Sequence, residues 1–211
     1  MVEKKLTGKI AGERIRMMET PRPPDGIIEG FQALGDATGI VSDVMDELGI
    51  TGVVGASVLK PTFAGSRVVG TALTVRNIVQ REHVYETARR HVNKMAEFEA
   101  HNLARPGDVV VIDGVRDIAH SRRVGYPVWA TEVTPVTGKW RIETIEINGE
   151  IEVAGIGVAP GDIVLADDTG VCFIPQVRAA KVLELARRKY AAENAKCTAI
   201  DAGVPVADLP A

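Results

Sequence analysis

A run of four consecutive β-branched residues, Val109–Ile112, is the feature that most restricts how this chain can fold. Pro106 and Gly107 precede the run and Gly114 follows it. An uninterrupted β-branched run bounded by turn-forming residues is typical of a strand that is covered on both faces of its sheet. The sequence therefore predicts an α/β fold in which this strand is buried.

Charged side chains come directly after this run. Asp113, Arg116 and Asp117 follow the carboxyl end of the strand, where α/β sheets normally bind their ligands. A carboxylate there could hold a hard divalent cation. A guanidinium could bind a substrate carboxylate or stabilise an oxyanion. An ordinary surface ion pair fits the same residues, and the pattern alone leaves both interpretations open.

Composition limits the class of protein. A chain of 211 residues is long enough for one domain with a substantial core. The formal net charge of −3 argues against general nucleic-acid binding, which needs a basic face. No apolar run approaches the roughly 20 residues that span a bilayer, and no apolar signal segment follows Met1. We therefore expect a cytoplasmic protein with no membrane span, in which Cys172 and Cys197 are reduced.

Four segments have apolar residues at helical spacing: 1–20, 35–49, 83–103 and 176–195. In the second of these, Thr38 or Ser42 could cap the start and Gly49 suits the position after the last turn. Three histidines lie in the third segment, but their spacing does not match a zinc motif, so we interpret them as surface residues: His83, His91 and His101.

Strand patterns recur along the rest of the chain. They cover residues 68–78, with a possible bulge at Gly70, and residues 127–130, 163–165 and 171–174. Residues 142–153 predict a hairpin, because alternating apolar residues flank Asn148-Gly149, the pair favoured in type I′ turns. Asp162 is expected to cap a turn. Asp167 and Asp168 separate two strands, and a turn is favoured there over a metal site.

Several longer motifs resemble the RraA-like family. They are GDVVVIDGVRD at 107–117, GYPVWATEVTP at 125–135 and PGDIVLADDTGVCFIP at 160–175. SDVMDELG at Ser42–Gly49 and GTALTVR at Gly70–Arg76 match earlier landmarks of that family in the same order. The resemblance runs from about Gly35 to Pro175. The family includes class II pyruvate aldolases that cleave 4-hydroxy-4-methyl-2-oxoglutarate, some with oxaloacetate decarboxylase activity.

The resemblance implies a single-domain, three-layer β/β/α swivelling-domain fold. Residues 1–30 would form an N-terminal arm or helix, residues 31–200 the RraA-like domain, and residues 201–211 a C-terminal tail. The family also implies a homo-oligomer, either a trimer or a hexamer, with the active site at the subunit interface and Mg²⁺ or Mn²⁺ as cofactor. The expected function is that of a metal-dependent lyase acting on a short, carboxylated 2-oxo acid.

The roles of individual residues also follow from the resemblance. Asp117 would bind the metal, and Arg116 would contact the pyruvyl oxygen that becomes an enolate. Asp113 and Gly114 would belong to the substrate-binding loop. Glu193, from the C-terminal helix of a neighbouring subunit, would complete the catalytic set.

The sequence departs from the family in two places. In the family a glycine-rich loop, a helix and a second strand precede the Arg-Asp motif, whereas here Val109–Ile112 runs directly into Gly114–Asp117. Either the protein has lost this segment or the intact protein carries one that this sequence lacks. We expect the second, because deleting a strand exposes sheet edges and apolar surface. The other departure is His120, which stands where aldolase-type members usually have a carboxylate.

These departures keep an alternative function open. Some RraA members are not enzymes and regulate an RNA-degrading nuclease by docking on it. The Arg116–Asp117 pair favours the enzyme, because a docking surface has no need of a metal ligand beside an oxyanion partner. The shortened segment favours the protein-binding regulator, since an incomplete pocket could not catalyse.

Overall fold

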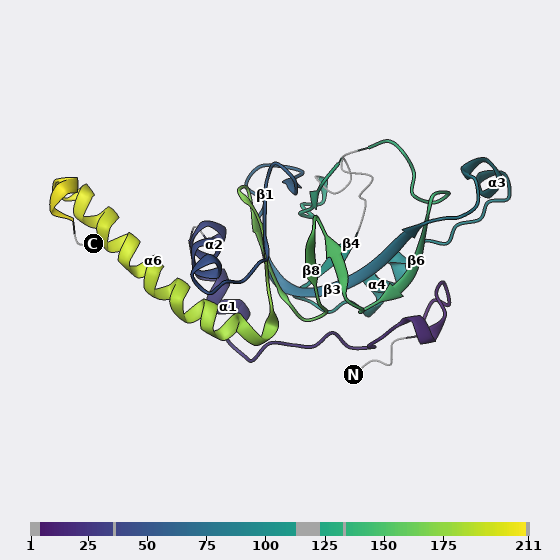
Figure 1. Ribbon diagram of the computed structural model, residues 1–211, viewed down its shortest axis with the longest axis horizontal. Coiled ribbons are helices and arrows are strands. Elements are labelled where there is room, and N and C mark those ends of the chain that lie inside the picture. The colour runs from purple at the N-terminus through teal and green to yellow at the C-terminus, as the bar shows by residue number, and fades with distance from the viewer. Residues whose placement is uncertain (1–4, 36, 113–122, 133, 210–211) are drawn as a thin grey trace.

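The computed structural model describes residues 5–35, 37–112, 123–132 and 134–209 and has a mixed α/β fold (Figure 1). The strands are β1 (Val53–Gly55), β2 (Lys60–Pro61), β3 (Val68–Val79), β4 (Asp108–Ile112), β5 (Trp129–Ala130), β6 (Ile142–Ile147), β7 (Ile151–Val153), β8 (Ile156–Val158), β9 (Ile163–Asp167) and β10 (Gly170–Ile174). The helices are α1 (Ile27–Gln32), α2 (Ala37–Glu47), α3 (Val84–Arg89), α4 (Glu97–Leu103) and α6 (Ala179–Asp201), with 3-10 turns at Gly12–Arg14, Gln176–Arg178 and Val206–Asp208. The predicted fold class is confirmed.

The long strand β3 organises the main sheet, whose order is β1-β10-β9-β3-β4 with β6 also paired to β3. β3 runs antiparallel to β9 and β6 and parallel to β4. The bulge predicted at Gly70 is wrong, because the register shifts between Arg76 and Asn77. Gly70 has a different role: a Cβ atom there would lie 2.4 Å from the carbonyl oxygen of Gly107, so only glycine allows this close approach.

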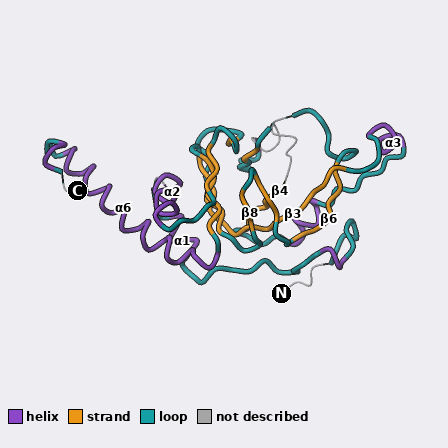
Figure 2. The backbone as a smooth tube through the Cα atoms, viewed as in Figure 1, coloured by secondary structure: helices purple, strands orange, loops and turns teal. Residues whose placement is uncertain are grey.

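Three layers result from the alternation of side chains along the buried strands. On β9, Ile163 and Leu165 pack against α1, α2 and α6, whereas Val164 and Ala166 point to the opposite face. That opposite face is covered by β7, β8 and the short pair β2–β5. The expected β/β/α layering is therefore present, and Figure 2 shows α1, α2 and α6 gathered on one side of the sheet.

Helix α2 agrees with its sequence prediction, except at its start. Ile40, Val41 and Val44 are buried, and Gly49 has a positive φ of 64° after the last turn. Thr38 does not cap the helix, because it lies within it and its hydroxyl donates to Asp167 instead.

The predicted hairpin over 142–153 is wrong, although both of its strands exist. β6 pairs with β3, and β7 pairs with β8 through a turn in which Ala154 and Gly155 both have positive φ. Asn148 instead points toward the N-terminal segment, where its Nδ2 donates to the carbonyl oxygen of Met17 at 2.9 Å. The long partner offered by β3 therefore outweighs the local turn signal.

The single helix predicted over 83–103 is also wrong. It is divided into α3 and α4 by a segment in which His91 has a φ of 54°. The segment pairs with β6 instead: the Thr144 backbone N–H donates to the carbonyl oxygen of Lys94, and the Ala96 N–H donates to the Thr144 hydroxyl. These tertiary hydrogen bonds override the helical spacing of the apolar residues.

The N-terminal segment does not form the amphipathic helix predicted for it. Residues 5–22, which we call the N-terminal strap, contain only one 3-10 turn and lie along the sheet toward α1 (Figure 1). Ile10 and Ile15 are buried there against β3, β6 and α4. Their burial is achieved by docking of an extended segment rather than by one face of a helix.

Helix α6 is longer than predicted and only its first half is packed. Its buried residues are Ala179, Val182, Leu183 and Ala186, and the remainder of its 23 residues extends away from the sheet (Figure 1). In the described part of the chain, no helix is both long and apolar enough to cross a membrane.

Candidate functional site

The Arg-Asp motif follows the described end of β4. Asp113, Gly114, Arg116 and Asp117, together with His120, lie outside the described residues. The last described residue before them is Ile112, which lies opposite Val75 in the parallel pair β3–β4. The motif is therefore connected to the carboxyl end of a parallel strand, the place where α/β sheets bind ligands.

β4 is less buried than its sequence predicts. Only Val111 is buried, whereas Val109, Val110 and Ile112 are half-buried. The reason is its position at the edge: within the described ranges β4 pairs with β3 alone. The expectation that both faces of β4 are fully covered is therefore wrong.

The amino end of β4 is held by a buried carboxylate. The Asp108 side chain is 1% exposed, and its Oδ2 accepts hydrogen bonds from Arg22 Nη2 at 2.9 Å and from the Arg105 backbone N–H at 2.7 Å. The second guanidinium nitrogen of Arg22 contacts Oδ1. This bidentate pair ties the strap to the strand that leads into the Arg-Asp motif.

Glu193 lies in the exposed second half of α6, one helical turn after Lys189. Lys189 Nζ lies 3.2 Å from Asp43 Oδ2 and 2.8 Å from Glu47 Oε1, and these contacts raise the pKa of Lys189. Asp43 and Glu47 thus lie near one lysine on the α2–α6 surface, and Glu193 follows that lysine along α6. The sequence analysis missed the first two, although their spacing of four residues on α2 was a signal for a shared face.

A metal site is not built by the described residues alone. Among residues 5–35, 37–112, 123–132 and 134–209, no group of three histidine, cysteine, aspartate or glutamate side chains could hold an ion. His83 accepts a hydrogen bond from the Tyr85 backbone N–H, and the ring of His91 stacks edge-on against Trp140. Both observations agree with the interpretation of these histidines as surface residues.

The Asp167–Asp168 pair forms a turn, as predicted. Asp167 Oδ1 accepts from the Thr169 backbone N–H at 2.8 Å, and its carboxylate also accepts from the hydroxyls of Thr38 and Thr169. Burial alone raises the pKa of Asp167, but the hydrogen bonds from Thr38 and Thr169 outweigh it and lower that pKa. Asp168 points elsewhere and accepts from the exposed Gly65 N–H.

This contrast gives a prediction. Asp167→Ala should lower the free energy of unfolding by about 2–3 kcal/mol, because three donors lose a charged acceptor. Since the folded-state pKa of Asp167 is lowered, its contribution is complete above the ordinary carboxyl pKa and is lost as pH falls through the lowered value. Urea unfolding across that range should show the difference between the two proteins shrinking. Asp168→Ala, the matched control, should cost less than about 1 kcal/mol at every pH; equal effects of the two substitutions would refute the assignment.

Asp162 caps its turn as predicted. Its carboxylate accepts from the backbone N–H groups of Ala159 at 2.9 Å and Gln176 at 3.0 Å. Burial raises the pKa of Asp162, although these two hydrogen bonds oppose the shift. The residue joins the start of β9 to the segment before α6, which is a structural role.

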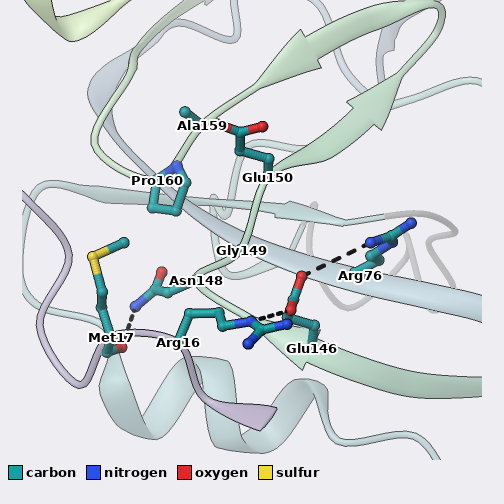
Figure 3. A pocket seen from close by; sticks show the side chains of 9 residues that line it. All are labelled: Arg16, Met17, Arg76, Glu146, Asn148, Gly149, Glu150, Ala159 and Pro160. Atoms are coloured by element: carbon teal, nitrogen blue, oxygen red, sulfur yellow. Dashed lines mark hydrogen bonds and ion pairs between the residues drawn. The ribbon is translucent and has the colours of Figure 1, made fainter.

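A recess of about 520 Å³ lies where the strap crosses the end of β6 (Figure 3). Glu146 stands between Arg16 and Arg76 in it, and Asn148 binds the Met17 carbonyl. The charged groups in this recess are therefore engaged mainly with one another. We assign it to docking of the strap rather than to catalysis.

Comparisons with known proteins agree with this fold. The family model described as RraA-like (Aldolase/RraA) matches residues 109–173. A Halalkalibacterium halodurans protein named "Putative 4-hydroxy-4-methyl-2-oxoglutarate aldolase" is 29% identical over 185 residues, which cover 79% of this chain and 86% of that protein. These two matches support the RraA-like family for this chain.

Another relative is much longer than this chain. Protein DlpA of Legionella pneumophila is 25% identical over 193 residues, which cover 77% of this chain. The matched region is 31% of DlpA, so this chain spans about a third of that relative.

Two solved structures share the fold. A protein from Pseudomonas syringae pv. tomato superposes with a TM-score of 0.70 at 22% identity, covering 87% of this chain and 96% of that chain. RraAS2 of Streptomyces coelicolor, described as an unusual member of the RNase ES inhibitor RraA protein family, superposes with a TM-score of 0.64 at 23% identity, covering 82% and 96%. At these identities the likeness concerns the fold alone.

Proposed function

We propose that this RraA-like chain is a metal-dependent carbon–carbon lyase that cleaves a short, carboxylated 2-oxo acid through a pyruvate enolate. The observation that carries the proposal is the Arg116–Asp117 pair, which the sequence places directly beyond the parallel strand β4 and inside the region matched by the family model. The similarity to the Halalkalibacterium protein supports the same reaction class.

The chemistry requires a place for developing negative charge. When the bond between the methylene carbon and the outer fragment of the substrate breaks, its electron pair moves into the 2-oxo group, whose oxygen becomes an enolate. The outer fragment leaves as carbon dioxide from a carboxylate, or as a carbonyl compound from an alcohol whose proton a base has removed. The Arg116 guanidinium would donate to the enolate oxygen and stabilise it mainly in the transition state. A proton then adds to the methylene carbon, delivered by water or a carboxylate, and pyruvate leaves.

Asp117 is the residue proposed to hold the divalent cation. Carboxylate oxygen is the ligand that Mg²⁺ prefers, and the ion commonly keeps several waters beside one or two carboxylates. A bound cation would polarise the 2-oxo group as a Lewis acid. Asp113 and Gly114 are proposed to orient the substrate carboxylate next to this position.

A neighbouring subunit is proposed to complete the site. Glu193 lies on the exposed half of α6, which extends away from the sheet that carries β4 (Figure 1). A helix placed in this way could present Glu193 to another copy of the chain. We therefore propose a homotrimer or a pair of trimers, in which each site combines residues of two subunits.

Mixing inactive variants tests this sharing. Asp117→Ala and Glu193→Ala should each be nearly inactive alone. After subunit exchange in an equal mixture, about a quarter of the sites would pair an intact Asp117 with an intact Glu193, and activity should return to about that fraction. Asp46→Ala in place of Glu193→Ala serves as the activity reference, because half of the sites in that mixture keep both Asp117 and Glu193 with or without exchange. A mixture that stays inactive, or a fully active Glu193→Ala protein, would contradict the shared site.

The second candidate function is a protein-binding regulator of an RNA-degrading nuclease. It is favoured by one feature, the direct run from β4 into the Arg-Asp motif, together with the edge position of β4 among the described residues. Such a regulator would need neither Asp117 nor a cation.

Incubation with oxaloacetate separates the two candidates. The lyase should release pyruvate and carbon dioxide faster than the metal-catalysed background, with Mg²⁺ or Mn²⁺ present, and addition of a chelator should stop it. Because free metal also decarboxylates oxaloacetate, the rate is compared with metal alone at the same concentration. No increase over that background, also with 4-hydroxy-4-methyl-2-oxoglutarate as substrate, would favour the regulator.

A further inference from the structure

The N-terminal strap is attached to the body largely through charge. Arg14 pairs with Glu143 at 3.4 Å, Arg16 with Glu146, and Glu19 with Arg105. The strap side chains of these three pairs are between 47% and 64% exposed, so solvent and salt screen them.

Two buried carboxylates on the body anchor the two ends of the strap. At one end, Glu99 of α4 is fully buried and accepts from the Thr7 backbone N–H at 2.8 Å and from the Thr7 hydroxyl. Burial raises the pKa of Glu99, but hydrogen bonds from Thr7, Asn102 and the Gly8 backbone outweigh burial and lower this pKa below its ordinary value. At the other end, Asp108 receives the bidentate contact of Arg22.

Apolar contacts between the anchors are sparse. Ile10 and Ile15 are buried and Leu6 is half-buried, in a cluster that also contains Leu73 and Ile147. Backbone hydrogen bonding is equally limited, since the Arg16 N–H donates to the Ile147 carbonyl at 3.0 Å within a single isolated bridge. The free energy gained by burying so few apolar side chains does not offset the conformational entropy lost when a segment of this length is ordered. Docking therefore depends on the charged contacts.

The strap is also separated from the rest of the core. Pro23 and Pro24 lie between it and α1, which begins at Ile27, and Pro21 lies just inside the end of the strap. No helix or strand is assigned between Arg22 and Ile27, and proline donates no backbone hydrogen bond, so the strap can move without breaking secondary structure in this connection.

We propose that residues 5–22 are a latch, which opens as one cooperative unit while the sheet stays folded and whose closure is governed by ionic strength. Opening uncovers the cluster formed by β3, β6 and α4, against which Val110 and Ile112 of β4 also pack. It also leaves Asp108, at the start of the strand that leads into the Arg-Asp motif, without Arg22. The inference rests on these contacts and is independent of the lyase proposal.

Hydrogen exchange of the whole chain, measured by mass spectrometry, tests the latch. Glu99→Ala breaks one anchor, so exchange at the distant Arg16 amide should rise about 10–100-fold, the range expected when a charged hydrogen-bond acceptor is lost. Raising salt to about 1 M, where the Debye length falls to about 3 Å, should accelerate exchange across the whole wild-type strap. Amides of β9 and β10 should keep their wild-type exchange in both cases.

Matched variants decide between a latch and simple fraying. Arg22→Ala, at the opposite anchor, should accelerate the same set of strap amides as Glu99→Ala, whereas Glu86→Ala on the exposed face of α3 should change none of them. Acceleration confined to residues beside Thr7 in one variant and beside Arg22 in the other would overturn the cooperative latch. The latch would also be overturned if the amides of β9 and β10 accelerated as much as those of the strap, in both Glu99→Ala and the milder Glu99→Gln. The strap would then open only through global unfolding.

Discussion

Replacement of Asp117 by alanine is expected to abolish lyase activity together with its dependence on a divalent cation. The cation would lose the only carboxylate predicted to bind it directly, and water ligands alone do not hold it in a fixed position. Asp117→Asn should behave almost the same, because a neutral amide oxygen is a poorer partner for Mg²⁺ than a carboxylate oxygen. Steady-state kinetics and a metal titration on the purified variants measure both effects.

A control variant separates the loss of a ligand from a general change in charge. Asp46 lies exposed on α2, so Asp46→Ala removes one carboxylate and should leave turnover and metal binding unchanged. Wild-type turnover in Asp117→Ala would mean that Arg116 and Asp117 form only an ordinary surface ion pair, which the sequence also allows.

Arg116→Lys is expected to lower turnover by about 10²–10³-fold, by analogy with the loss of one oxyanion donor. Lysine keeps the positive charge but loses the planar fork that can donate two hydrogen bonds to one oxyanion or carboxylate. Metal affinity should stay close to that of the wild type, because the arginine is not a ligand. The two substitutions are thus expected to separate metal binding from enolate stabilisation.

The corresponding control is Arg89→Lys, at an exposed residue of α3 that pairs with Glu86. It should change neither turnover nor metal affinity. If Arg116→Lys instead weakened metal binding as strongly as Asp117→Ala, the proposed division of roles between the two residues would be wrong.

Local sequence patterns predicted the strands well where both faces are buried. β3, β9 and β10 are largely apolar runs, and they occur close to their expected places. The turn at Asp167–Asp168 followed from side-chain chemistry that acts within a few residues. In these cases the interactions that determine the structure are themselves local.

The incorrect predictions share a different cause, which is competition from a distant partner. Asn148-Gly149 is a strong hairpin signal, yet β6 pairs with β3, whose 12 residues offer a longer antiparallel partner. The helix predicted over 83–103 is interrupted because Lys94 and Ala96 bind Thr144. The residue pattern within these segments does not predict contacts with residues that are distant in the sequence.

The N-terminal strap is the clearest example. Leu6, Ile10 and Ile15 recur at nearly helical spacing, but their partners lie on β3, β6 and α4. The basic residues of the segment have partners as well, since Arg14, Arg16 and Arg22 face Glu143, Glu146 and Asp108. The sequence analysis predicted an N-terminal arm or helix here without assigning it any contact with the body.

The candidate site was predicted from family resemblance and from its place after β4. Asp113, Gly114, Arg116 and Asp117 lie outside the described residues, so their roles remain predictions, as does the segment expected between β4 and the motif. What the structure adds is the anchoring of β4 by Asp108 and the pairing of Lys189 on α6 with Asp43 and Glu47 on α2. Both features depend on contacts between distant segments.

Proton exchange into pyruvate tests the central claim most directly, because every substrate of the proposed class passes through the same enolate. Pyruvate is incubated with the protein in D₂O, and the methyl signal is followed by proton NMR with Mg²⁺ or Mn²⁺ and with a chelator. The account predicts metal-dependent loss of the methyl signal in the wild type and none above background in Asp117→Ala. Exchange at the background rate in the wild type with metal present, or equal exchange in Asp117→Ala, would contradict it.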